Sequence, residues 1–211
     1  MENNTCVKIA ETYIKLNLDF NEYQNQDLRT FFVEIIKKSE HLNTYVEKLQ
    51  YRIEFDKGST KVRITFFGFL TTFIVGYAEL ANSIRTLYND VKNVSEFIIN
   101  HAVEKNLLIE KNILNTQKRT GIIGKLRLIL NRIELIQNEI NNLEDNQNQE
   151  ELNALYQEIS DLIQVLSYND QQLFIAQFNQ IGINLPQPNQ NVNIHLRNLY
   201  AIEPEKFIPD L

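Results

Sequence analysis

The fold is decided by residues 62–101, which read VRITFFGFLTTFIVGYAELANSIRTLYNDVKNVSEFIINH. From Leu70 onward, apolar residues recur at steps of three and four, the spacing that keeps one face of a helix apolar. This spacing predicts a long helix that begins at about Phe67 and ends at about His101. The residues before Phe67 are expected to form a strand instead, because they pair with the residues that precede them.

That pairing is a β-hairpin over residues 51–64, with its turn at residues 56–59. Pairing residues whose numbers sum to 115 places Ile53 opposite Val62, on an apolar face, and sets the charged residues on the other face. Residues 13–20 alternate as a strand does, and a helix is predicted from about residue 25 to about residue 50. The order strand, helix, hairpin, long helix predicts an α+β head with both helices on one face of its sheet.

The sequence of the second half of the chain predicts mainly helices. Residues 102–115 are expected to be helical. Residues 122–143 and 152–166 then repeat apolar residues at steps of four and three, on either side of a short polar segment. Two such seams indicate an antiparallel, coiled-coil-like helical hairpin. A short helix is expected to follow and to stop at Gly182, and residues 192–196 alternate like an edge strand.

The predicted fold class is therefore α+β and predominantly helical, in two regions. Residues 1–101 form the α+β head with its long spine helix. Residues 102–211 form the helical hairpin region, with a short C-terminal helix and an extended tail.

Charge is unevenly distributed along the hairpin region. Residues 111–132 contain six basic residues and no acid, whereas residues 133–196 contain only acidic charges. One interpretation is a surface that orients a protein partner or a second copy of the chain. The alternative is a solvated surface, since runs of charge usually serve solubility. On the first interpretation the candidate partner-binding residues are Lys118, Arg119, Lys125, Arg127, Arg132, Glu144, Asp145, Glu150 and Glu151.

Composition argues against several classes of partner and reaction. The net charge of −6 disfavours nucleic acid as the default partner. Cys6 is the single cysteine, so no intramolecular disulfide can form, and a cytoplasmic location is the expectation. The three histidines are far apart, and residues 120–125 have the wrong spacing for a phosphate-binding loop. The sequence therefore predicts no enzyme, no metal and no cofactor.

Three functions remain as hypotheses. The first is a non-enzymatic protein-interaction or self-association module that presents the helical hairpin. The second is a small membrane-acting effector or toxin that inserts residues 64–78, although fifteen uncharged residues are short for a spanning helix of about 20. The third is weak binding of an anionic ligand, nucleic acid or lipid, through residues 111–132.

Overall fold

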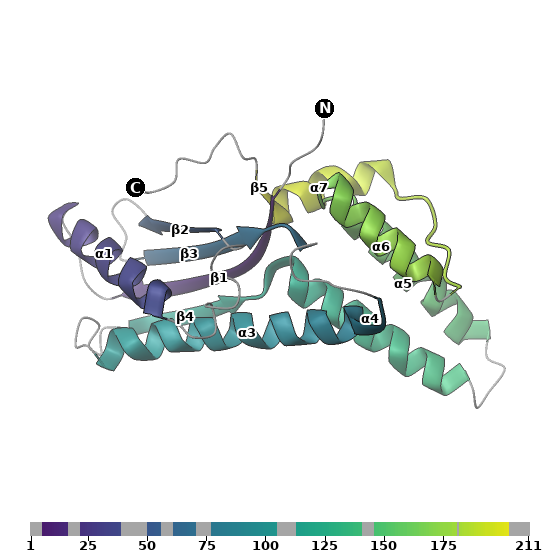
Figure 1. Ribbon diagram of the computed structural model, residues 1–211, viewed down its shortest axis with the longest axis horizontal. Helices are drawn as coiled ribbons and strands as arrows, with labels where there is room; N and C mark the ends of the chain where they lie inside the picture. Colours follow the sequence, from purple (N-terminus) through teal and green to yellow (C-terminus); the bar gives the residue numbers. More distant parts are fainter. Residues whose placement is uncertain are drawn as a thin grey trace. The chain divides into compact units, whose positions relative to one another are not determined.

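The computed structural model describes residues 6–16, 22–38, 50–55, 61–70, 77–104, 113–140, 146–180 and 182–202. Its helices and strands form a mixed α+β architecture that is predominantly helical, and this confirms the broad class of the prediction (Figure 1). In chain order the elements are β1 (Cys6–Leu16), α1 (Glu22–Lys38), β2 (Gln50–Phe55), β3 (Lys61–Gly68), α3 (Tyr77–Glu104), β4 (Ile113–Arg119), α4 (Gly121–Ile140), α5 (Asn146–Ile163), α6 (Tyr168–Gln180), α7 (Gln190–Tyr200) and β5 (Ala201–Ile202).

The described residues divide into two compact units. The sheet unit takes its described residues from Lys8–Gly68 and Tyr88–Gly121. The helical unit takes its own from Phe69–Leu87 and Ile122–Phe207, together with the first two residues of β1. Helix α3 contributes to both units, and the predicted boundary after residue 101 lies inside this helix.

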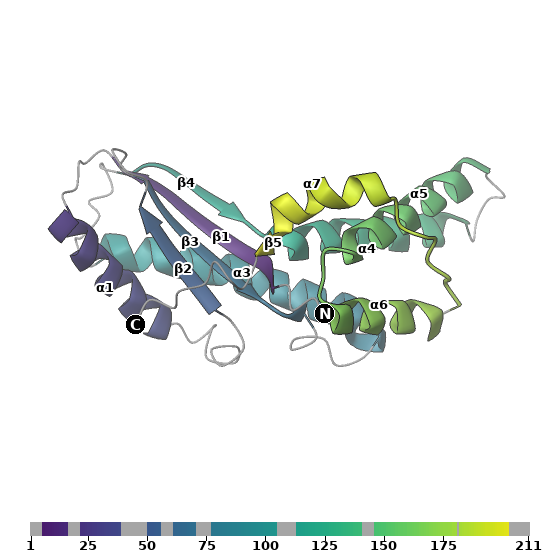
Figure 2. The same cartoon turned by 90° about the horizontal axis from the view of Figure 1, so that it is seen from above.

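The sheet has the strand order β2-β3-β1-β4, and β5 pairs with the start of β1 (Figure 2). Strand β1 is antiparallel to β4, and β2 is antiparallel to β3. Along β1 the residues Thr12, Ile14 and Leu16 are fully buried, while Lys15 is exposed. The buried side faces α3, because the Thr12 hydroxyl donates a 2.7 Å hydrogen bond to Ser95 Oγ. This alternation is what a sheet with one covered face requires.

The hairpin β2–β3 forms, but its register differs from the prediction. Ile53 lies opposite Ile64 and Glu54 lies opposite Arg63, so each pair is shifted by two residues. A shift of two keeps every side chain on its predicted face, so alternation alone cannot distinguish the two registers. Turn geometry distinguishes them, and the predicted turn at residues 56–59 lies outside the described residues.

The apolar segment 64–78 is not one continuous helix. Its first five residues are the end of β3, so the prediction that the long helix begins at about Phe67 is wrong. The described long helix, α3, begins at Tyr77 and continues to Glu104. Phe66 and Phe67 are both buried in β3, where a strand covered on its two faces reads as a continuous apolar run. Within the described ranges, no helix combines the length and the apolar character needed to span a bilayer.

Two further segments differ from their predicted secondary structure. Residues 113–115, predicted as the end of a helix, belong to β4, because β4 completes its backbone hydrogen bonds by pairing with β1. Residues 192–196, predicted as an edge strand, lie inside helix α7. Residues 192–196 contain only three alternating apolar residues and β4 contains only two, Ile113 and Leu114. Patterns this short do not distinguish a strand from a helix, so tertiary pairing decides.

Helices α4, α5 and α6 form where the sequence predicts helices. The buried residues of α4 keep the predicted spacing, with Ile122, Leu126, Ile129, Ile133 and Ile136 all inside. Helix α6 ends before Gly182, whose φ of +80° is the left-handed conformation expected at a helix end. After Gly182 the chain runs along α5, where Asp161 Oδ1 accepts a 2.5 Å hydrogen bond from the backbone N–H of Asn189.

Candidate functional site

The predicted partner-binding residues lie on three elements. Lys118 and Arg119 belong to β4 of the sheet unit. Lys125, Arg127 and Arg132 belong to α4 of the helical unit, and Glu150 and Glu151 to α5. Glu144 and Asp145 lie outside the described residues.

The two basic residues of β4 are engaged within the sheet unit. Lys118 Nζ lies 2.7 Å from Glu96 Oε1 of α3. Arg119 Nη1 lies 3.1 Å from Glu11 Oε1 on β1, and its Nη2 donates a 2.8 Å hydrogen bond to Gln117. These cations are therefore neutralised by acids that are distant in sequence, which weakens the case for an anionic ligand at this segment.

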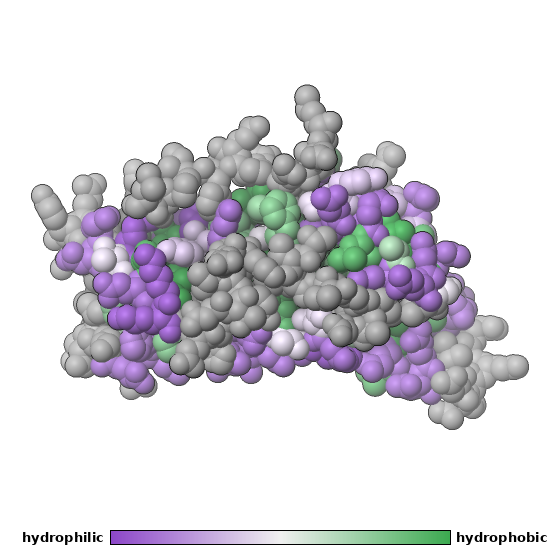
Figure 3. Space-filling model, in the orientation of Figure 1, coloured by the Kyte–Doolittle hydropathy of each residue, from purple (hydrophilic) through white to green (hydrophobic). Residues whose placement is uncertain are grey.

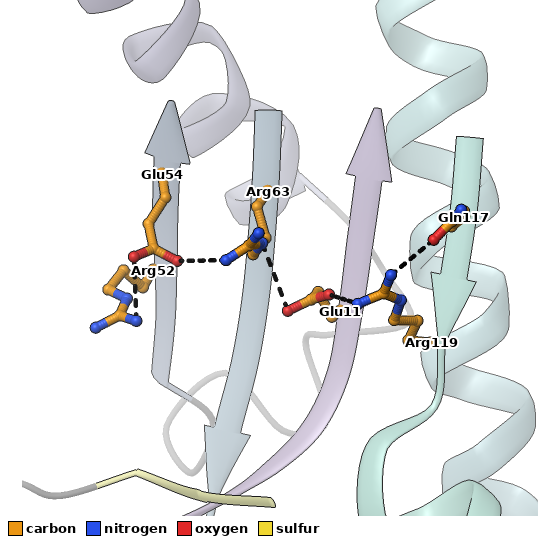
Figure 4. A network of polar contacts seen from close by, with 6 residues as sticks. All are labelled: Glu11, Arg52, Glu54, Arg63, Gln117 and Arg119. Carbon is orange, nitrogen blue, oxygen red and sulfur yellow. Dashed lines mark hydrogen bonds and ion pairs between the residues drawn. The ribbon is translucent and has the colours of Figure 1, made fainter. Parts of the chain in front are cut away.

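Arg119 is one end of a chain of ion pairs that crosses four strands (Figure 4). Glu11 contacts both Arg119 and Arg63, the latter at 3.8 Å, and Glu54 contacts Arg63 at 3.9 Å and Arg52 at 3.1 Å. The Glu11 side chain at the centre is 12% exposed, the least of the five charged groups. Alternating signs on adjacent strands stabilise the pairing of those strands. This face is best explained as a stabilising network.

Helices α4 and α5 are joined by two ion pairs whose residue numbers run in opposite directions. Lys125 pairs with Glu158, and Arg132 pairs with Glu151. The second pair is bidentate, with Arg132 Nε 2.5 Å from Glu151 Oε1 and Nη2 3.0 Å from Oε2. Basic and acidic segments of the predicted charge pattern therefore neutralise each other inside the chain at these positions. A planar, two-bond contact also fixes the geometry of the two helices.

Replacing Arg132 with alanine is expected to raise the pKa of Glu151 toward its ordinary value. The hydrogen bond from Arg132, and then its charge, hold that pKa low in the folded protein. Because the folded-state pKa is below the unfolded-state pKa, the pair contributes stability above the unfolded-state pKa. That contribution is lost as pH falls through the folded-state pKa. NMR titration of the side-chain carboxyl resonances measures the shift.

The same titration contains its own control. Lys118 lowers the pKa of Glu96 through a hydrogen bond, at a site that Arg132 does not contact. The Glu96 titration should therefore be the same in the wild type and in Arg132→Ala. An unchanged Glu151 titration in that variant would contradict the assigned contact.

The outward side of α4 carries two large apolar residues. Leu128 is 59% exposed and Leu135 is 53% exposed. They are seven residues apart, and because each residue of a helix turns by about 100°, their side chains point in almost the same direction. The buried stripe of α4, centred near Leu126 and Ile133, points in roughly the opposite direction. We call Leu128 and Leu135 the α4 ridge.

Polar side chains flank the α4 ridge and are themselves held in place. On one side, Arg85 of α3 donates hydrogen bonds of 3.2 and 3.1 Å to Asn131 Oδ1 and also pairs with Glu134. On the other side, Arg132 is held by Glu151. The ridge is thus an apolar strip between fixed polar groups, on a helix supported by both α3 and α5. Such a strip on a rigid element is typical of a binding surface.

Comparisons with protein-family models, with curated proteins and with solved structures found no match for this chain. On the face shown in Figure 3, the described surface is mostly hydrophilic with separate apolar patches. Within the described ranges, His, Cys, Asp and Glu side chains form no group of three that could hold a metal ion. His101 stacks on Phe97, with ring centroids 5.4 Å apart.

Cys6 is expected to react slowly with thiol reagents in the native protein. It is 8% exposed, and burial, with a smaller effect from the negative charge of Asp170, raises the pKa of its thiol. The reactive thiolate is therefore scarce at neutral pH. We expect the rate of modification by a coloured disulfide reagent to rise by roughly tenfold or more when the protein is unfolded in denaturant. Equal native and unfolded rates would contradict this burial.

The sequence prediction did not include the α4 ridge, because the ridge lies outside the main apolar spacing of residues 122–143. Leu128 and Leu135 fall between the positions of that spacing, on residues that a two-helix seam leaves unused. Their separation of seven residues is itself a visible signal. Apolar residues in excess of one stripe indicate a second contact surface on the same helix.

Proposed function

We propose that this protein is a non-enzymatic interaction module that presents the α4–α5 helical pair to a protein partner through the α4 ridge. The observation that carries the proposal is the exposure of Leu128 and Leu135 on one line of a charged, ordered helix. Burying an exposed leucine is worth roughly 1.5–3 kcal/mol, so an exposed pair on one line favours an occupied surface.

The ion pairs Lys125–Glu158 and Arg132–Glu151 support a helical pair that keeps its shape when free. A preformed surface loses little conformational entropy when a partner binds. We further propose that the apolar residues between α4 and α5 pack as the coiled-coil-like seam that their spacing predicts. In this arrangement one stripe of α4 holds the hairpin together and the opposite stripe remains for a partner.

A binding role is favoured over a catalytic one by the character of the exposed groups. The thiol of Cys6 is buried and its pKa is raised. Carboxylates pair with the side chains of Arg52, Arg119 and Arg132. An exposed apolar line with polar borders instead resembles the centre and rim of a protein interface.

The proposal can be tested by immobilising a tagged copy of the chain and exposing it to untagged chain and to native cell lysate. We expect retention of the untagged chain or of a defined partner by the wild type. Leu128→Glu/Leu135→Glu should abolish that retention, because two charges would have to be buried. Gln172→Glu, which adds a charge at an exposed residue of α6, is the control and should retain as the wild type does. Equal retention by the ridge variant would contradict the proposal.

A further inference from the structure

We propose that residues 183–202 form a C-terminal arm that opens locally while the rest of the helical unit stays folded, with Asp161 of α5 as the latch that holds it closed. The arm consists of an extended strap, residues 183–189, followed by α7 and β5. Its opening uncovers the start of β1. All of these parts belong to the helical unit, and the inference does not depend on the α4 ridge.

The strap is attached to α5 by side chains from one side of that helix. Ser160 and Asp161 follow Gln157 at three and four residues, so the three side chains share a face. Gln157 Nε2 donates a 2.9 Å hydrogen bond to the carbonyl oxygen of Gln187, and the Ser160 hydroxyl donates one to the carbonyl oxygen of Pro186. The two prolines of the strap have no N–H to donate. The strap therefore depends on side chains of α5 for its attachment.

Asp161 is the latch because it holds the end of the strap and the start of α7 at once. Its side chain is buried, its Oδ1 accepts the hydrogen bond from the Asn189 backbone, and its Oδ2 accepts a 3.1 Å bond from Asn189 Nδ2. Asn189 is the N-cap residue of α7, and its side chain makes no hydrogen bond to that helix. The carboxylate of Asp161 thus lies at the N-terminus of α7, where the helix dipole favours a negative charge. Gln157 Nε2, 3.0 Å from Oδ1, holds the carboxylate in place.

Helix α7 itself adds little to the attachment of the arm. Ile194 is 70% exposed, Leu199 is 47% exposed, and the structure describes no buried side chain from residue 194 to residue 200. After α7, β5 is only two residues long, and its Ile202 is buried. The arm is therefore anchored at Asp161 and at Ile202, with exposed side chains between the two anchors. Segments with few buried apolar groups open at a lower free energy than the core.

Strand β5 covers the start of β1. Ile202 lies opposite Cys6, and Ala201 lies opposite Val7. Side chains that are opposite each other in an antiparallel pair share a face, with Cβ atoms about 5 Å apart. Ile202 therefore lies beside the Cys6 side chain and contributes to its burial. Since Cys6 is the single cysteine, its reaction with a thiol reagent reports the opening of the arm at one defined place.

The kinetics of thiol modification in the native protein test the latch. Asp161→Ala removes both hydrogen bonds that Asn189 donates to the carboxylate, and we expect it to raise the rate of Cys6 modification at least about fivefold. Asn189→Ala changes an exposed residue and removes only the Nδ2 bond, so it should raise the rate about threefold. Because the opening is local, these rates should change little at low urea concentrations, before the global unfolding transition begins.

Two controls separate arm opening from global destabilisation and from loss of charge. Ile129→Val lowers global stability at a buried residue of α4, and Glu150→Gln removes an acid from an exposed residue of α5. Both should leave the native rate of Cys6 unchanged. An unchanged rate in Asp161→Ala would overturn the inference, as would an equal acceleration by Ile129→Val or a wild-type rate that follows global unfolding from the lowest urea concentrations. If Asp161→Ala does not fold, the same criteria apply to Asn189→Ala.

Discussion

Gly121→Ala is expected to lower the free energy of unfolding by at least about 3 kcal/mol. Gly121 begins α4 with a φ of +49°, a left-handed conformation that costs an L-residue about 1–2 kcal/mol. An added Cβ would also collide with the carbonyl oxygen of Lys8 and lie 2.9 Å from that of Ile9. Because both obstacles are backbone atoms of β1, neither can move without disturbing the sheet. Urea unfolding followed by circular dichroism measures the change.

Gly182→Ala is the matched control for Gly121→Ala. Gly182 also has a positive φ, of +80°, but a Cβ there meets no atom within 4 Å. It should therefore lose only the backbone term of roughly 1–2 kcal/mol. If the two alanine variants were equally stable, the close approach of Gly121 to β1 would be refuted.

Asp170→Ala is expected to lower the free energy of unfolding by about 2–4 kcal/mol. Asp170 is fully buried, and its Oδ2 accepts a 3.0 Å hydrogen bond from the backbone N–H of Leu70, one hundred residues away. Alanine would leave that buried donor without its acceptor. The carboxylate also lies in the first turn of α6, where the Ser167 hydroxyl accepts a hydrogen bond from the Asp170 backbone. The contact with Leu70 connects α6 to a distant part of the helical unit, whereas the contact with Ser167 is local to the start of α6.

Two substitutions separate these contributions. Asn169→Ala changes an exposed residue of the same helical turn and should change stability by less than about 0.5 kcal/mol. Asp170→Asn keeps one acceptor oxygen and should lose less than Asp170→Ala. If the alanine variant unfolds at the same urea concentration as Asn169→Ala, the contact with Leu70 contributes nothing.

The sequence predicts the hairpin and the main helices because their residues repeat with one clear period. Ile53, Val62 and Ile64 share a face in any register that keeps the alternation, so the face was predicted correctly and the register was not. Leu126 and Ile133 belong to three turns or more of a helical repeat, which leaves no competing interpretation. The elements that were predicted correctly have longer periodic patterns than the elements that were predicted wrongly.

The secondary structure of short segments was predicted wrongly because it depends on partners that lie far away in the chain. β4 is a strand because Ile14 and Glu11 of β1 offer it a free edge about a hundred residues earlier. The candidate site has the same limit. Charge runs at residues 111–132 were visible, but their acceptors Glu11, Glu151 and Glu158 are set by tertiary structure. Leu128 and Leu135, in contrast, are apolar residues on the second face of α4 and can be recognised from the sequence alone.

The most direct measurement of association through the α4 ridge is the molar mass in solution by light scattering, for the chain alone over a range of concentrations and for tagged chain recovered from native lysate. A small apolar interface predicts weak association, so the series should extend to concentrations on the order of 100 μM or above. We predict that the wild type exceeds the mass of one chain in at least one of the two preparations, while Leu128→Glu/Leu135→Glu stays at the mass of one chain in both. A wild type that keeps the mass of one chain in both preparations, or a double variant that associates as strongly as the wild type, would contradict an interface at this ridge.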